Sequence, residues 1–209
     1  MFAQALTLAA ALLLVAPGPG KVWAGAPTDQ LRAQINRTIQ ILDDPELKKP
    51  GKMRDRRAAV RQVANDIFDF GETAKRSLAR HWAARSQAER EEFVQLFADL
   101  LERSYISKIE LYGGEKIRFV GEATDPDGAI VKSRLVTKTD AEIPIDYRMH
   151  LRGEKWLVYD VLIEGVSLIS NYRTQFNKII TTSSYQELVK KMKSKQEEFI
   201  QEEKRTSQK

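Results

Sequence analysis

Two carboxylates stand in an otherwise apolar stretch of the chain, and they are the side chains best placed to do chemistry. From Trp156 to Ile163, apolar residues occupy both alternating sides, which predicts a central strand covered on both faces. Asp160 and Glu164 fall on the same side as Trp156. A carboxylate in such surroundings needs hydrogen bonds or a cationic partner. With a nearby tyrosine, Asp160 could act as a general base; the alternative, which we favour, is a structural pairing with an arginine or with backbone amides.

Other residue patterns that carry catalysis or bind metals are missing from the sequence. The two histidines, His81 and His150, are far apart, and no cluster has the spacing of metal ligands. There is no cysteine to act as a nucleophile, and no glycine-rich loop of the phosphate-binding type. The sequence therefore predicts no catalytic residue, no metal and no cofactor. We expect a binding protein rather than an enzyme.

The first 26 residues have the pattern of a cleavable export signal. Leu6–Val15 forms an apolar core of the usual length, and Ala24-Gly25-Ala26 supplies small residues at a cleavage site. We therefore expect residues 1–26 to be a signal peptide and the exported chain to begin at Pro27. No other long apolar run follows, so the exported chain is expected to be soluble.

Basic residues outnumber acidic ones, with 34 lysines and arginines against 29 aspartates and glutamates. The formal charge of +5 favours anionic partners, which include nucleic acids, anionic lipid headgroups and acidic protein surfaces. Because an exported protein rarely meets nucleic acid, we expect lipid or protein partners and no nucleic acid. The hydrophobic fraction of 42% is enough for a sizeable core.

Helical periodicity dominates the first half of the chain. Apolar residues recur three and four positions apart, which predicts helices over Thr28–Asp43, Arg57–Phe70, Glu72–Ala83 and Gln87–Tyr112. Ser86 and Glu89 form a capping box that starts the longest of these helices. A charged segment, 46–57, connects the first two. We interpret it as a solvated loop and helix start, with a patch for a headgroup or a partner as the alternative.

Alternating polarity replaces the helical period after Gly113-Gly114. Strands are predicted from Lys116, over Ala129–Thr137, over Ile143–Leu151 and from Trp156, and short turns join them into a four-stranded antiparallel meander. Gly165 ends the last strand, and Ser167 is placed to cap the helix that follows over Leu168–Thr182.

These elements predict a single α+β domain over residues 27–200. Helices occupy 27–112, the sheet 115–166 and C-terminal helices 167–200, while 201–209 is expected to be a frayed, charged tail.

One face of the predicted sheet is apolar and could hold a ligand. Strand alternation builds it from Val131, Leu135, Ile145, Tyr147 and Met149, with some of Val158, Tyr159, Val161 and Leu162. The face is expected to lie opposite the apolar stripe of the Gln87–Tyr112 helix, which includes Tyr105. An apolar face of this kind can be a filled core or a cavity, and the pattern of residues allows both.

A spacing of residues around the last strand resembles a known family signature. Trp156-x-x-Tyr159-Asp160-x-x-x-Glu164-Gly165-Val166-Ser167, then Asn171-Tyr172-Arg173 and Phe176, is similar to the MlaC/toluene-tolerance family. The triplet Phe68-Asp69-Phe70, Trp82 and the apolar spacing from Phe93 to Tyr105 match the same pattern. The resemblance extends from about Leu31 to Leu188.

The resemblance implies a fold, a ligand and partners. Proteins of this family have a nuclear transport factor 2-like α+β fold, in which a curved antiparallel sheet and helices enclose an apolar pocket. They are periplasmic and hold a diacyl glycerophospholipid by its acyl tails. They pass it between an outer-membrane lipoprotein–porin complex and an inner-membrane ABC transporter with an MCE-domain subunit, which maintains outer-membrane lipid asymmetry. Asp160, Glu164, Gly165 and Arg173 belong to the structural part of the signature.

Three hypotheses follow for the function. The first is a periplasmic phospholipid carrier whose pocket consists of Val131, Leu135, Ile145, Tyr147, Met149, Tyr105, Val158 and Val161. The second is a small-molecule enzyme of the steroid-isomerase type that uses Asp160 and a nearby tyrosine in the same pocket. The third is an interaction protein with a filled core. We favour the carrier.

Overall fold

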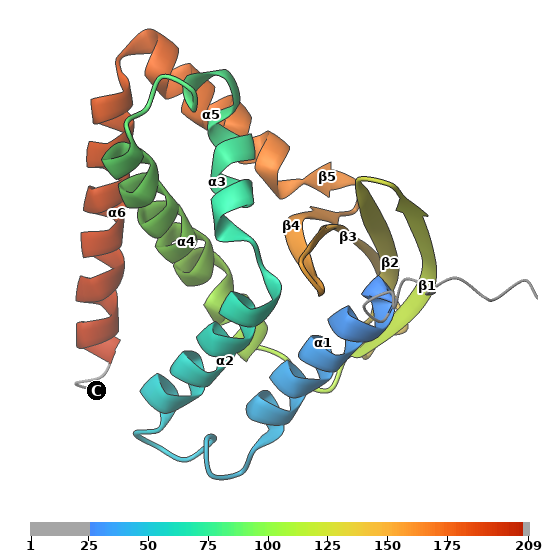
Figure 1. Ribbon diagram of the computed structural model, residues 1–209. Helices are drawn as coiled ribbons and strands as arrows, with labels where there is room; N and C mark the ends of the chain where they lie inside the picture. Colours follow the sequence, from blue (N-terminus) through green and yellow to red (C-terminus); the bar gives the residue numbers. More distant parts are fainter. Residues whose placement is uncertain (1–25, 207–209) are drawn as a thin grey trace, which may run out of the picture.

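The computed structural model describes residues 26–206 and forms an α+β fold. The helices are α1 (Pro27–Asp43), α2 (Met53–Ile67), α3 (Phe70–Leu78), α4 (Gln87–Glu110), α5 (Leu168–Thr182) and α6 (Tyr185–Thr206), with a 3-10 turn, η1, at Ala79–His81. The strands are β1 (Lys116–Asp125), β2 (Gly128–Val136), β3 (Glu142–Arg152), β4 (Lys155–Ile163) and β5 (Val166–Ser167). Figure 1 shows α1 lying along the curved sheet, while α3, α4, α5 and α6 form a separate helical layer.

The predicted curved antiparallel sheet is confirmed, but the number of strands differs. Within residues 26–206 five strands pair in the order β1-β2-β3-β4-β5, where the sequence predicts four. The fifth arises because Glu164 and Gly165 both have positive φ, 51° and 80°. Two such residues in succession make a tight hairpin turn. The chain therefore reverses, and Val166 and Ser167 pair with the end of β4.

The predicted boundaries of several helices are wrong, most clearly those of the second and the last helix. The second helix begins at Met53 rather than at Arg57, so Arg54 and Arg56 are helical, and it ends at Ile67 rather than at Phe70. The last helix continues to Thr206, past residue 200, where we expected fraying. The predicted signal peptide, 1–26, lies outside the described residues except for Ala26. In the part of the chain that the structure describes, no helix has the length and apolarity needed to cross a bilayer.

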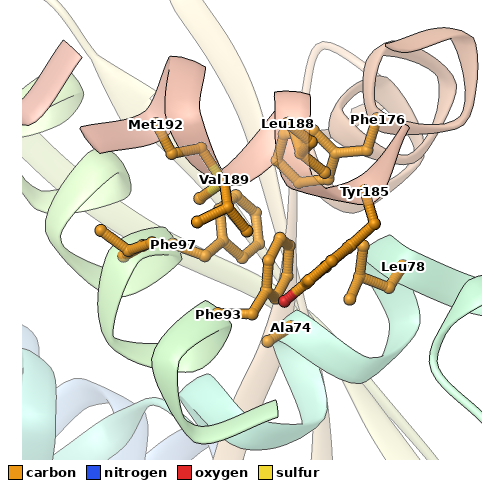
Figure 2. Close-up of a cluster of buried hydrophobic side chains, with 10 residues drawn as sticks. Ala74, Leu78, Phe93, Phe97, Phe176, Tyr185, Leu188, Val189 and Met192 are labelled. Carbon is orange, nitrogen blue, oxygen red and sulfur yellow. The ribbon is translucent and has the colours of Figure 1, made fainter. Parts of the chain in front are cut away.

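The helical layer has its own aromatic core. Ser86 caps α4 through the predicted capping box, and α4 then points Phe93 and Phe97 between α3, α5 and α6. Both rings meet Phe176 of α5 edge-on, with ring centres 5.6 and 5.2 Å apart. Figure 2 shows these rings interleaved with the aliphatic side chains of α3 and α6.

The position of this core corrects the predicted partner of the longest helix. We expected its apolar stripe to face the sheet. Instead, Phe93, Leu96 and Phe97 face the other helices, and Ile106 packs on Leu42 and Val60 of α1 and α2. The apolar face of the sheet is covered by Leu31 and Ile35 of α1 and by Ile67 and Phe68 at the end of α2. A helical stripe predicts burial but does not specify the partner.

The aromatic core predicts a large, local effect of truncation. Phe93 is fully buried, so Phe93→Ala should lower the free energy of unfolding by about 3–5 kcal/mol, through lost apolar burial and the cavity left behind. Phe199→Ala, a half-buried phenylalanine near the end of α6, is the matched control and should lower it far less. Chemical denaturation of both variants makes the comparison. Equal losses would contradict the assignment of Phe93 to the core.

Candidate functional site

A β-bulge in β4 decides which residues share a face of the sheet. Met149 of β3 lies opposite Val158, and Arg148 lies opposite Asp160, so β4 has one extra residue, Tyr159, between these pairs. An extra residue reverses the alternation of every side chain beyond it. Val158 and Val161 therefore lie on the same face, although strict alternation would separate them.

The apolar face is tightly packed at the end that α1 covers. Val131, Met149 and Val158 have no exposed surface, and Tyr147 is 9% exposed. They form one buried cluster with Leu31, Ile67, Ala129 and Trp156. Ile145 and Val161 pack on its margin and are only partly buried. Six of the eight predicted pocket residues are thus brought together in and around one cluster, and its deep part is filled.

At the other end the same face stays half-exposed. Register pairs Ile117 with Leu135, Leu135 with Ile143, and Ile145 with Ile163, so these side chains are neighbours across four strands. All five are of intermediate exposure. We call Ile117, Leu135, Ile143, Ile145 and Ile163 the open strip. An apolar strip that its own fold leaves partly uncovered offers a surface to an apolar ligand.

One buried polar pair interrupts the apolar face, and the sequence analysis missed it. Ser133 lies between Val131 and Leu135, is fully buried, and donates a hydrogen bond to the Ile145 carbonyl, 2.9 Å away. The Tyr147 hydroxyl interacts with the Ser133 side chain, and burial raises the Tyr147 pKa to about 12. Strand alternation alone places Ser133 on this face, so the signal was available. The Ser133 hydroxyl is therefore satisfied within the protein.

The two remaining predicted pocket residues lie outside the cluster. Leu135 belongs to the open strip rather than to the packed end. Tyr105, on α4, is partly buried beside Tyr172 of α5, and burial raises its pKa. It lies with the helical layer because the stripe of α4 turns away from the sheet.

Asp160 occupies the opposite face and serves a structural role. It is 4% exposed and accepts three hydrogen bonds: from Ser167 Oγ at 2.7 Å, from the Ile169 amide at 3.1 Å, and from Arg148 Nη1 at 3.3 Å. Ser167 in turn caps α5 by accepting from the Ser170 amide at 3.0 Å. Asp160 therefore holds the start of α5 on β4.

This placement corrects three expectations. Asp160 does not share a side with Val158, because the bulge at Tyr159 reverses it. Glu164 is exposed in the hairpin turn and not in an apolar frame. Arg173, which we considered as the partner of these carboxylates, instead donates to Ser170 Oγ at 3.2 Å, and Arg148 takes its place.

The same placement takes Asp160 out of the apolar pocket to which the isomerase hypothesis assigned it. That hypothesis requires Asp160 and a tyrosine in the apolar pocket, but Tyr147 lies in the apolar cluster and Asp160 lies behind the sheet. The His150 ring, whose Nε2 lies 3.0 Å from Asp69 Oδ2, also stands on that rear face. Within residues 26–206 no three histidines or carboxylates gather in a way that could hold a metal.

Two arginines at the end of the charged segment 46–57 pack inside the fold, while its lysines and Arg54 stay exposed. Arg57 makes a two-pronged contact with Glu110 of α4, with Nε–Oε1 and Nη2–Oε2 distances of 3.0 and 2.9 Å. Arg56 reaches the same carboxylate at 3.4 Å. Both arginines are about four-fifths buried, so they join α2 to α4 instead of facing a partner.

Comparison with known proteins places this arrangement in a family. The sequence profile of a family described as "MlaC protein" matches residues 32–194, most of the chain. The chain belongs to the MlaC family. It is 23% identical over 138 residues to the intermembrane phospholipid transport system binding protein MlaC of Haemophilus influenzae (strain ATCC 51907 / DSM 11121 / KW20 / Rd). That match covers 62% of this chain and 64% of the relative's length, so somewhat less than two thirds of the relative is matched.

A solved structure confirms the fold of this MlaC-family chain. The phospholipid-binding protein from Ralstonia solanacearum, in complex with a phospholipid, superposes with a TM-score of 0.74 at 20% sequence identity. The match covers 83% of this chain and 98% of that one. A curved antiparallel sheet with flanking helices is therefore the shared architecture.

The role of Asp160 can be tested by matched substitutions of two carboxylates. Asp160→Asn should lower the free energy of unfolding by about 1–3 kcal/mol, because buried donors lose a charged acceptor. Glu164→Asn should change it by less than about 0.5 kcal/mol, since the residue is exposed and asparagine tolerates positive φ. Thermal and chemical unfolding measure both. If Asp160→Asn spared stability, the structural role would be wrong.

The contact between α2 and α4 predicts a pH dependence. Burial by itself would raise the Glu110 pKa, but the hydrogen bonds and charges of Arg57 and Arg56 outweigh it and lower the pKa below its ordinary value. The stabilisation is therefore complete above the ordinary glutamate pKa and is lost as the pH falls through the lowered one.

Unfolding measured across this range checks the prediction. At neutral pH, Glu110→Gln should lower stability by about 1–2 kcal/mol, and the difference from the wild type should shrink as the pH falls. Glu46→Gln, which removes an exposed carboxylate paired with Lys49, serves as the control and should have an effect below about 0.5 kcal/mol. A difference that persisted unchanged at low pH would contradict the ion pair.

Proposed function

We propose that this chain is a periplasmic carrier that holds a diacyl phospholipid by its acyl tails and catalyses no reaction. The observation that carries the proposal is the graded burial of one apolar sheet face, which is filled at the α1 end and half-exposed at the open strip. The packed end keeps the fold intact, and the open strip supplies the surface for the tails. The related proteins named for phospholipid binding support the same assignment.

The physics of lipid transfer explains why such a surface is needed. Two acyl tails hold roughly 30 methylene groups, each worth about 0.8 kcal/mol when buried, so exposing both tails costs on the order of 24 kcal/mol. Free diffusion of the lipid through water is therefore negligible. A carrier must offset most of this free energy, and release then requires an acceptor that offers the tails an equivalent apolar environment.

In this proposal the predicted pocket residues divide into two roles. Leu135, Ile145 and Val161 contact the tails directly, because they stand at the half-exposed margin. Val131, Met149 and Val158 form the floor beneath them, together with the buried Tyr147. Because these side chains are already ordered in the free protein, ligand binding costs little further conformational entropy at the pocket wall.

The proposed route follows from the family. We infer that the chain is exported by residues 1–26 and carries lipid between an outer-membrane lipoprotein–porin complex and an inner-membrane ABC transporter with an MCE-domain subunit. The support is the relative named as part of an intermembrane phospholipid transport system. In this role the chain contributes to the lipid asymmetry of the outer membrane.

Co-purified lipid tests the carrier directly. Native mass spectrometry of the exported chain, with extraction of its lipids, should find about one diacyl phospholipid per chain. Incubation with phospholipid vesicles should refill a chain that has been stripped of lipid. A chain that is isolated empty and takes up nothing from vesicles would rule the carrier out.

Tryptophan substitutions test where the tails lie. Leu135→Trp should fill part of the open strip, displace bound lipid, and change stability by less than about 1 kcal/mol because the site is not fully packed. Val131→Trp enters the filled floor and should cost about 1–3 kcal/mol or more. Lys132→Trp, exposed on the other face of the same strand, is the control and should alter neither property.

Bound lipid and the unfolding midpoint must be measured on each variant. Retained lipid together with a large loss of stability in Leu135→Trp would refute the placement of the tails on the open strip.

A further inference from the structure

A cleft lies behind the sheet, on the face opposite the apolar cluster. It has a volume of about 370 Å³ and is formed by α3, β3, β4 and the first turns of α5. Three arginines from three different elements line it: Arg76 of α3, Arg148 of β3 and Arg173 of α5. Asp160 is the carboxylate among its lining residues.

Each guanidinium is held in place by a different contact. The Arg76 guanidinium lies 4.1 Å from the centre of the Tyr159 ring, and its Nε is 2.8 Å from Glu72. Arg148 contacts Asp160 at 3.3 Å. Arg173 donates to the Ser170 hydroxyl, and among the described residues it has no carboxylate within ion-pair distance. The three side chains are therefore positioned by the protein before any ligand arrives.

The charges within the cleft do not cancel. Asp160 already accepts hydrogen bonds from Ser167 and from the Ile169 amide, so Arg148 shares it with two other donors. Glu72 is shared among Arg76, Lys75 and Arg152. Arg173, at the exposed side of the cleft, donates to a neutral partner, the Ser170 hydroxyl. The cleft thus combines fixed guanidinium groups with excess positive charge.

We propose that this cleft binds a phosphate group. Guanidinium groups match phosphate oxygens in pairs, and a tetrahedral phosphate has enough oxygens to accept from three arginines that approach from different elements. A carboxylate has two oxygens and satisfies fewer of these donors. The phosphate can come from solution or from the headgroup of a lipid at a membrane surface. The site is separate from the proposed acyl-tail surface, since the sheet lies between them.

Binding of inorganic phosphate to the exported chain is the first test. Calorimetric titration at constant ionic strength, with chloride as the reference anion, should show saturable binding of phosphate. Arg173→Gln should weaken it about tenfold or more, which is the effect of losing one charge-assisted hydrogen bond. Lys178→Gln removes the same charge from an exposed position on the same helix and should leave binding unchanged. Arg173→Lys, which keeps the charge and loses the fork, should fall between them.

Vesicles separate the two sources of phosphate. Binding to phosphatidylglycerol vesicles that depends on Arg173 and is competed by inorganic phosphate would assign the cleft to a lipid headgroup. Phosphate binding without such vesicle binding would assign it to free phosphate. Bound lipid and the unfolding midpoint of Arg173→Gln should match the wild type, so this test is independent of the carrier proposal.

Three results would overturn the inference. The first is that neither phosphate nor vesicles bind in a manner that depends on Arg173. The second is that Lys178→Gln weakens binding as much as Arg173→Gln does. The third is that poly-glutamate alone binds through Arg173, in which case the cleft recognises an acidic protein segment and not phosphate.

Discussion

The structure depends on one extra residue in a strand and on the two groups that hold it there. At the bulge in β4, the Val158 carbonyl accepts from the Asp69 amide at 2.9 Å, and the Tyr159 carbonyl accepts from the Thr73 hydroxyl at 3.0 Å. Both donors come from the junction of α2 and α3, where Phe68 forms a parallel bridge with Val158. These two hydrogen bonds give the carbonyl groups at the bulge the partners that an irregular strand lacks. They also join the helical layer to the sheet at this point.

The bulge also separates two kinds of surface. In front of it, Val158 and Val161 complete an apolar face; behind it, Asp160 fixes the start of α5 and Arg148 enters a polar cleft. A regular strand would place one valine behind the sheet and move the carboxylate into the apolar cluster, where it would need a costly partner. A single extra residue therefore allows an apolar surface and a polar, charged cleft to lie on opposite sides of the same strand.

Much of this organisation could be predicted from the sequence, because periodicity reports burial directly. The sequence predicts the boundaries of α5, the capping box of α4, the antiparallel meander and the family. What could not be predicted depends on tertiary partners. The apolar stripe of α4 does not identify α6 as the helix that packs on it. The alternation of residues in β4 does not indicate the position of the bulge. The ion pair of Arg57 could not be predicted, because its partner Glu110 lies 53 positions away in the sequence.

The open strip has a further consequence for the chain in solution. The five aliphatic side chains of the open strip follow one another across four adjacent strands, and they remain partly exposed to water whenever nothing covers them. An exposed apolar patch of this kind favours self-association of the protein, which increases with protein concentration. The net positive charge of the chain provides a repulsion that opposes pairing of such patches, and salt weakens that repulsion. Protein concentration and ionic strength therefore determine how much of the protein with an uncovered open strip can remain monomeric.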